Sequence, residues 1–374
     1  MKESLDVGAG IDRLKASFNE VIADYPGGAS ISIWRDGKCL LSLQGGEASP
    51  GKPWMRNTPC LIWSAGKGIA SACTLYALQE HDITLNQRVA DIWPEFGAEG
   101  KDRITFAEIL SHRAGLAAID RKGFSITDHE GVIGALSAQR PNWIPDGSHG
   151  YGARTFGFLL EEVVRRLTGE TLSSYWDKTF RIPLHLDLWF GLPSSCLEMA
   201  AEVIAPKTPP APSPFTRAFS DSSSLTRRAL NEPGGPITPT AMNSPTLRMA
   251  SIPSLGVIST ADALAHFYSL LTGNSTQFTP STRLLMQTTL SKGLDRVLME
   301  KTSFSAGFMS NEYGVYGPST SAFGHPGAGG ALGFADPDSG LGFAFIPSGM
   351  TPGALPGPRT RRLVSALYGM PKTE

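Results

Sequence analysis

The sequence lacks several features that would place it in particular protein classes. No apolar run approaches the ~20 residues that a membrane span requires, so we expect no membrane partner. Neither sign of charge is in excess, because 33 Lys and Arg stand against 34 Asp and Glu, and this argues against a nucleic-acid partner. The four cysteines are Cys39, Cys60, Cys73 and Cys196. They form no Cys-x-x-Cys and have no paired spacing, which argues against a disulfide framework and against a thiolate metal site.

The amino terminus also lacks a readable secretion signal. Glu3 and Asp6 stand where such a signal needs a basic start and a continuous apolar core. We therefore expect a cytoplasmic protein. What is there is a chain of 374 residues, 41% of them hydrophobic, which can bury a substantial core in two domains or in one large one.

Both ends of the chain predict β-hairpins. Near the start, residues 29–34 and 39–43 flank an Asp-Gly turn, and near the end residues 331–335 and 340–346 flank a second turn. A helix is expected before the first hairpin and another over residues 359–370. Between the two ends the pattern is mostly helical.

These elements predict an α+β protein, an α/β sandwich whose antiparallel sheet forms from both chain ends and is flanked by helices. We expect a discontinuous α/β domain over residues 1–80 and 255–374, with a mainly helical domain inserted at 81–254. Residues 205–245 are rich in Pro, Ser and Thr, and we expect an extended loop with little regular structure there. Such a loop serves as a lid or pocket wall, or is disordered.

The strongest chemical signal is the pattern Ser64-Ala65-Gly66-Lys67 at the start of an expected helix. Its spacing puts both side chains on one helix face, one turn apart. The positive end of the helix favours a developing oxyanion, and partial burial lowers the pKa of a lysine. A neutral amine beside a hydroxyl can then take its proton. A second copy, from Ser49 to Lys52, lies in a Gly/Pro turn with no helix after it.

Two further segments complete a candidate site. Tyr151 lies in a loop that leads into a helix, where a phenol could accept the Ser64 proton if nearby cationic groups lower its pKa. The alternative is a half-buried packing tyrosine. The Gly-rich stretch at 323–330 lets a strand edge approach a ligand, and a free N–H there can complete an oxyanion hole. The alternative is a Gly-rich turn.

Together and in this order, the three segments resemble the serine β-lactamase and penicillin-binding-protein superfamily, most closely class C β-lactamases and family VIII carboxylesterases. The superfamily's Ser-x-x-Lys is matched from Ser64 to Lys67. Its Tyr-x-Asn is matched only at Tyr151, because Ala153 replaces the Asn. Its third motif, Lys-Thr-Gly or His-x-Gly, is matched at residues 325–327. The likeness extends from about residue 25 to residue 365.

The resemblance implies an acyl-enzyme on Ser64, with Lys67 and Tyr151 as general bases. It also implies an oxyanion hole made by the backbone N–H groups of Ser64 and Ala328, and no metal or cofactor. The positions that would bind substrate or tune Tyr151 are His325, Gly327, Trp63 and Ala153.

Two other histidines are less informative. We interpret His112 as a structural loop residue with a backbone partner. His149, two residues before Tyr151, could rim the pocket, but we leave it outside the catalytic set.

The departures from the lactamase pattern bear on the substrate. Ala153 offers no amide donor to a β-lactam or peptide, and His325 in place of Lys leaves less positive charge for a substrate carboxylate. These features predict a serine carboxylesterase acting on small, weakly polar esters. The alternatives are a β-lactamase or D-amino-acid peptidase, an acyltransferase with the same acyl-enzyme, and a non-catalytic binding descendant of the fold.

Overall fold

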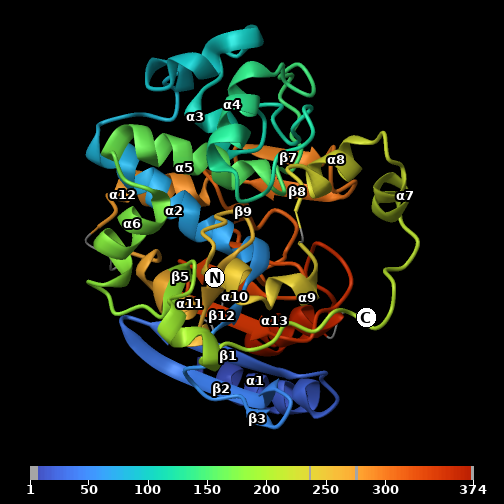
Figure 1. Ribbon diagram of the computed structural model, residues 1–374. Helices are drawn as coiled ribbons and strands as arrows, with labels where there is room; N and C mark the ends of the chain where they lie inside the picture. Colours follow the sequence, from blue (N-terminus) through green and yellow to red (C-terminus); the bar gives the residue numbers. More distant parts are fainter. Residues whose placement is uncertain (1–6, 236, 274–276, 372–374) are drawn as a thin grey trace.

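A nine-stranded antiparallel sheet forms the centre of the molecule (Figure 1). The structure, a computed structural model, describes residues 7–235, 237–273 and 277–371. The strand order is β3-β2-β1-β12-β11-β10-β9-β8-β7, so both chain ends contribute, as the two hairpins predict. The strands of this sheet are Gly28–Arg35 (β1), Lys38–Ser49 (β2), Lys52–Pro53 (β3), Ser291–Leu294 (β7), Lys301–Phe304 (β8), Met309–Ser310 (β9), Phe323–Pro326 (β10), Leu332–Asp336 (β11) and Leu341–Pro347 (β12).

Local turn chemistry fixes the first hairpin. Asp36 and Gly37 both have positive φ, at 51° and 72°, which is the backbone of the tight turn that Asp-Gly favours between two strands. The turn sets the register in which Ile31 lies opposite Leu43, while β1 pairs on its other side with β12.

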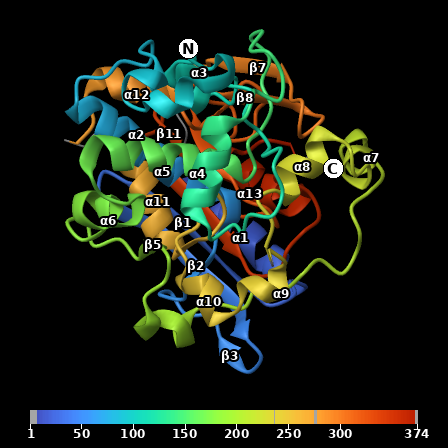
Figure 2. The ribbon, with the colours of Figure 1, turned by 45° about the horizontal axis from the view of Figure 1, so that its top comes forward.

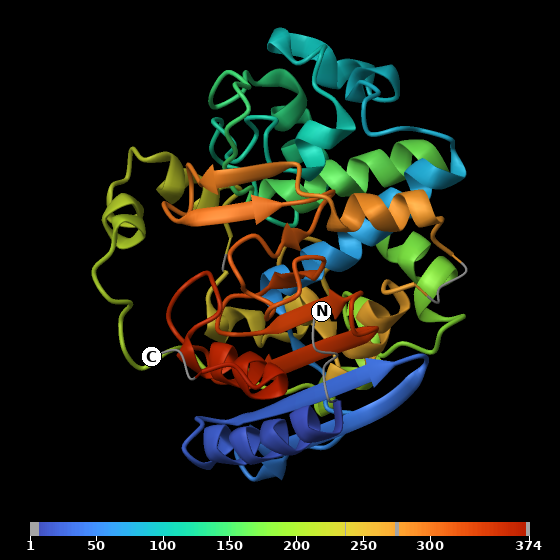
Figure 3. The same cartoon turned by 180° about the vertical axis from the view of Figure 1, so that it is seen from behind.

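Helices cover both faces of the sheet (Figure 3). Along β12, Phe343 and Phe345 belong to the core with α1 (Val7–Ala23) and α13 (Pro358–Tyr368), whereas Ala344 and Ile346 belong to the core with α11 (Ala261–Leu270). Successive residues of a strand point to opposite faces, so β12 is covered on both sides. The described helices contain none long and apolar enough to cross a membrane, and the four cysteines are free.

A group of helices lies around α2, as Figure 2 shows. Helix α2 is buried around almost its whole circumference and packs against α5. The helices are Gly66–Glu80 (α2), Phe106–Leu110 (α3), His129–Ala138 (α4), Thr155–Thr168 (α5), Leu172–Trp176 (α6) and Pro280–Gln287 (α12). Helix α5 ends at Gly169, which adopts the left-handed cap with φ 74°.

A second, three-stranded sheet joins distant parts of the chain. Its central strand β6 (Val257–Ser259) pairs with β4 (Cys60–Leu61) and with β5 (Leu188–Phe190). Strand β5 comes from the segment expected to be mainly helical. Strand β4 leads directly into the candidate nucleophile, so this sheet anchors that turn.

The expectation of an irregular loop over residues 205–245 is wrong. This segment contains α7 (Pro214–Ser220), α8 (Leu225–Asn231) and α9 (Pro239–Met242), and α10 (Pro245–Met249) begins at its end. Three of the four helices start with a Ser-Pro or Thr-Pro pair, in which the hydroxyl caps the helix and the proline occupies its first position. These prolines therefore start helices and do not break them.

Candidate active site

Ser64 lies in a short 3-10 turn, Trp63–Ala65, that runs directly into α2. The turn is held to the small sheet because the Ile62 N–H donates to the Val257 carbonyl at 2.9 Å. Trp63 has a φ of 50°, a left-handed backbone that a bulky residue adopts only under constraint. Trp63 and Ala65 are buried while Ser64 stays partly exposed, so its hydroxyl faces accessible space.

Lys67 is buried completely and reaches back to Ser64. Its Nζ lies 3.1 Å from the Ser64 Oγ and donates to the carbonyls of Ala153 at 2.8 Å and Ser254 at 2.6 Å. Burial lowers the pKa of Lys67 well below its ordinary value. A neutral amine has two N–H groups, which the two carbonyls occupy, and its lone pair then faces the Ser64 hydroxyl.

Glycine makes this placement of α2 possible. A Cβ at Gly66 would lie 2.4 Å from a methyl group of Val257, so α2 starts against β6 only because residue 66 has no side chain. The predicted pair of residues at positions 64 and 67 is thus brought together, on one helical turn.

Tyr151 lies beside this pair, in the loop before α5. Its ring centroid is 4.9 Å from the Lys67 Nζ. Burial raises the pKa of Tyr151, and a hydrogen bond with the Ser64 side chain opposes this rise only in part. The phenol therefore keeps its proton at neutral pH, so the condition under which it would act as a phenolate base is not met. It is placed to pass a proton on.

Asp295, which the sequence analysis missed, fixes the backbone of Tyr151. One carboxylate oxygen accepts hydrogen bonds from the N–H groups of Tyr151, Val297 and Leu298 at 2.8–3.1 Å, and the other accepts from the Thr302 hydroxyl. Asp295 is fully buried. Asp295 lies in the turn of a short hairpin. The neighbouring sequence therefore gives no sign that this residue differs from an ordinary solvated turn residue.

His325 lies next to Tyr151, with their ring centroids 5.9 Å apart. Its Nδ1 lies 2.7 Å from the Pro326 carbonyl and donates to it, which leaves an Nε2 lone pair. Within the described part of the chain this Nε2 has no hydrogen-bond partner. Burial lowers the pKa of His325 to about 3, so the ring is neutral and adds no positive charge to the site.

His112 and His149 both have structural partners, which we expected only for His112. The Nδ1 of His112 accepts a hydrogen bond from the Gly152 N–H at 3.2 Å, and the His112 ring packs 5.1 Å from that of Tyr151. The Nε2 of His149 lies 2.8 Å from the Thr302 hydroxyl. His149 thus extends the hydrogen-bond network of Asp295.

The Gly-rich stretch approaches the nucleophile from β10. A Cβ at Gly327 would lie 2.1 Å from the Ile62 carbonyl oxygen, two residues before Ser64, so this close approach requires glycine. The Gly327 N–H donates to the Ala331 carbonyl. The next N–H, that of Ala328, meets no acceptor among residues 7–235, 237–273 and 277–371, so it is available to a substrate oxygen.

Comparison with known proteins agrees with this arrangement. The sequence matches the family profile described as Beta-lactamase over residues 18–367. The "Esterase/beta-lactamase LipL" of Mycobacterium tuberculosis is 29% identical over 344 residues, which cover 86% of this chain and 76% of LipL.

Solved structures extend the likeness to nearly the whole fold. A penicillin-binding-protein homologue from Caulobacter crescentus superposes with a TM-score of 0.87 at 29% identity, covering 96% of this chain and 97% of that one. A family VIII carboxylesterase superposes with a TM-score of 0.86 at 28% identity, covering 97% of each chain. Because the profile match spans most of its length, the chain belongs to the beta-lactamase family, an enzyme family of serine hydrolases.

Proposed function

We propose that the protein is a serine carboxylesterase that hydrolyses small carboxylic esters through an acyl-enzyme on Ser64. The observation that carries this proposal is the buried Lys67 amine, which contacts two backbone carbonyls and the Ser64 hydroxyl and no carboxylate among the described residues. Burial favours the neutral form of such an amine, and the neutral form is a base for the hydroxyl beside it.

In the first half-reaction, the Ser64 hydroxyl gives its proton to Lys67 as its oxygen attacks the ester carbonyl. The oxyanion binds the N–H groups of Ser64 and Ala328. Tyr151 donates its phenol proton to the departing alcohol oxygen as the ester C–O bond breaks. The Lys67 ammonium then returns a proton to Tyr151, so the alcohol leaves with the equivalent of the serine proton and both groups are restored.

In the second half-reaction, Tyr151 and Lys67 transfer protons again while water attacks the acyl-enzyme. Tyr151 takes a proton from water as it passes its own phenol proton to the Lys67 amine, and the water oxygen attacks the acyl carbonyl. The Lys67 ammonium then returns that proton to the Ser64 oxygen as the bond between the acyl carbon and Ser64 breaks and the acid leaves. Covalent catalysis of this kind divides one difficult acyl transfer into two easier steps.

An ester fits the site better than a β-lactam. The neutral His325 supplies no fixed charge for the carboxylate of a β-lactam, and the Ala153 side chain supplies no amide donor. The similar proteins named as a family VIII carboxylesterase and as the esterase/beta-lactamase LipL support the same substrate class.

The test compares kcat/KM for p-nitrophenyl acetate with that for a chromogenic cephalosporin. We expect the ester to be preferred, Ser64→Ala to be inactive, and Tyr151→Phe to lose about 100-fold or more, since a positioned proton donor contributes about that much. Ser49→Ala, in the second Ser-x-x-Lys pattern, is the matched control and keeps full activity. A preference for the cephalosporin, or an active Ser64→Ala variant, would overturn the proposal.

A further inference from the structure

A cavity of about 230 Å³ is lined by none of the residues of the nucleophile machinery. We call it the arm pocket, because one wall is the arm, residues 205–224, which carries α7. The other walls are the β7–β8 turn and the loop after β12, and Figure 3 shows these three segments on the same side of the molecule. The residues of the arm pocket used below are Phe215, Leu298, Glu300, Pro352, Ala354 and Leu355.

The segment that directly follows the arm is held by hydrogen bonds. The Thr226 hydroxyl, two residues beyond the arm, donates to the Val297 carbonyl at 2.7 Å. Arg154 donates to the carbonyls of Asn231 and Pro233 at the end of α8. The carboxyl end of the arm is therefore anchored next to the β7–β8 turn.

Two walls of the arm pocket are joined by hydrogen bonds to segments of the candidate active site. In the loop after β12, the Thr351 N–H donates to the carbonyl of Gly329, the residue after Ala328. In the β7–β8 turn, Leu298 shares with Tyr151 the carboxylate oxygen of Asp295 that accepts both N–H groups. Through its walls the arm pocket is thus connected both to the oxyanion segment and to the loop that carries the proton donor.

The position of the arm pocket favours binding of the alcohol part of the ester over its acyl part. The alcohol oxygen must leave next to the phenol that protonates it, so the alcohol part of the ester extends toward the Tyr151 side. Tyr151 and Leu298 belong to the same apolar cluster, against which Phe215, Ala354 and Leu355 pack. Because Asp295 joins Tyr151 to the β7–β8 turn that carries Leu298, an alcohol group on the Tyr151 side extends toward the arm pocket.

The residues that line the arm pocket also indicate which kind of alcohol group it would bind. Apolar side chains dominate it, and Glu300 is its one charged residue among those described. A carboxylate at the pocket repels an anionic group. The volume is smaller than the roughly 300–1,000 Å³ of pockets for drug-sized ligands, and it suits a group of about one aromatic ring.

We propose, on the basis of the proposed esterase function, that the arm pocket binds the alcohol part of the substrate, an apolar alcohol without negative charge. The arm is then a specificity element of the active site, and the preferred substrates are esters of small aromatic or branched alcohols.

The test uses acetate esters, so that the acyl group stays constant while the alcohol changes. Leu355→Trp fills the pocket, and we expect it to lower kcat/KM for benzyl acetate by about 10-fold or more while that for methyl acetate stays the same. Leu284→Trp, at a leucine of α12 that is 61% exposed, is the matched control and changes neither. Glu300→Gln raises kcat/KM for the ester of a carboxylated benzyl alcohol and leaves that of benzyl acetate unchanged.

The result that overturns this inference is a Leu355→Trp variant that affects methyl and benzyl acetate equally, or one that changes only the acyl preference among p-nitrophenyl esters. A second readout separates it from the esterase proposal. Benzyl alcohol should bind to the inactive Ser64→Ala protein in ligand-observed NMR and lose that binding in the double variant with Leu355→Trp. Binding without ester hydrolysis by the wild type contradicts the esterase proposal alone, and hydrolysis without this binding contradicts the arm pocket alone.

Discussion

At the scale of single residues, the proposed esterase mechanism depends on the protonation state of Lys67. An amine accepts a proton only in its neutral form, and burial lowers the Lys67 pKa, so more of the amine is neutral at a given pH. We expect kcat/KM for a neutral ester to rise with pH through this lowered pKa and to level off above it. A stopped-flow or steady-state pH profile checks this.

Lys67→Met removes the base and should lower kcat/KM by about 100-fold to 10,000-fold, the usual contribution of general base catalysis. The pH dependence assigned to Lys67 should disappear with it. Lys52→Met, at the exposed lysine of the second Ser-x-x-Lys pattern, is the control and keeps the wild-type profile. A Lys67→Met profile that still bends at the same pH would assign the titration to another group.

At the scale of elements, the approach of β10 to the nucleophile turn depends on Gly327. Gly327→Ala places a methyl group against the Ile62 carbonyl and moves the oxyanion segment away from Ser64. A displacement of about 1 Å can cost about 100-fold in rate, so we expect a large loss of kcat/KM with little change in the CD spectrum. Full activity in Gly327→Ala would show that the two segments do not need this contact.

Gly134→Ala is the matched control for that change. Gly134 lies on the exposed side of α4, and a Cβ there meets nothing within 4 Å. Alanine is the better helix former by about 0.8–1.0 kcal/mol, so this variant should gain stability toward urea and keep its activity. A loss of stability would contradict the exposed position of residue 134 on α4.

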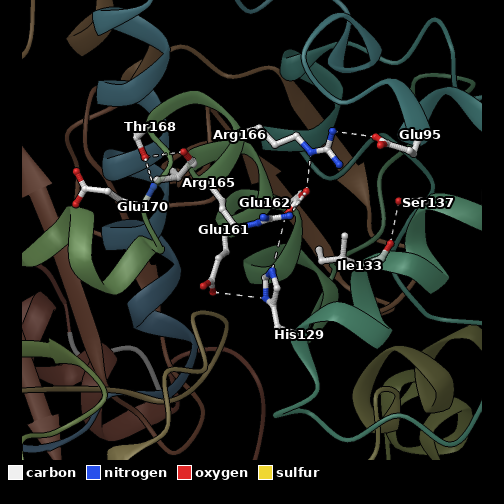
Figure 4. Close-up of polar contacts among 11 residues, drawn as sticks. Glu95, His129, Ile133, Ser137, Glu161, Glu162, Arg165, Arg166, Thr168 and Glu170 are labelled. Carbon is white, nitrogen blue, oxygen red and sulfur yellow. Dashed lines mark hydrogen bonds and ion pairs between the residues drawn. The ribbon is translucent and has the colours of Figure 1, made fainter.

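Helices α4 and α5 are joined by a buried charge network around Glu162 (Figure 4). Arg165 and Arg166 donate to its carboxylate at 2.6–2.9 Å, and the His129 ring lies 3.8 Å away. Burial raises the pKa of Glu162, but these charged partners outweigh it and lower the pKa to about 2. The depressed pKa means that the carboxylate stabilises the fold above its ordinary pKa of 4.5 and loses this effect as the pH falls toward 2.

Glu162→Gln should therefore lower the free energy of unfolding at neutral pH by about 3 kcal/mol, the cost of removing the buried member of an ion-pair network. The difference from the wild type should shrink as the pH falls below 4.5. Urea unfolding at several pH values checks both points. Asp91→Asn breaks an exposed pair with Arg88 and should cost no more than about 1 kcal/mol. A Glu162→Gln deficit that is independent of pH would contradict this account.

The first residues of the helices between residues 205 and 249 show why the sequence prediction of an irregular loop failed there. Ser213-Pro214 and Ser244-Pro245 each begin a helix, yet the same dipeptides also occur in turns. The outcome depends on the tertiary contacts that the whole segment makes, and the dipeptide itself does not encode these contacts. Asp36-Gly37, by contrast, gave a correct hairpin because the turn itself requires those residues.

At the scale of the whole molecule, long-range contacts separate what could be predicted from what could not. The sheet from both chain ends could be predicted from two local hairpins, and Ser64, Lys67 and Tyr151 from motif order and spacing. Asp295 could not be found, because its partner Tyr151 lies 144 positions earlier in the chain and only the fold joins them. The domain boundaries at residues 80 and 254 stay a prediction.

The central claim of the proposed function is the transfer of an acyl group to the Ser64 oxygen. The most direct measurement is peptide mapping by mass spectrometry after brief exposure of the protein to an activated ester. We predict one added acyl group, on the peptide that contains Ser64, and none in Ser64→Ala. An unmodified Ser64 in a protein that hydrolyses the ester, or an acyl group on another residue, would contradict the account.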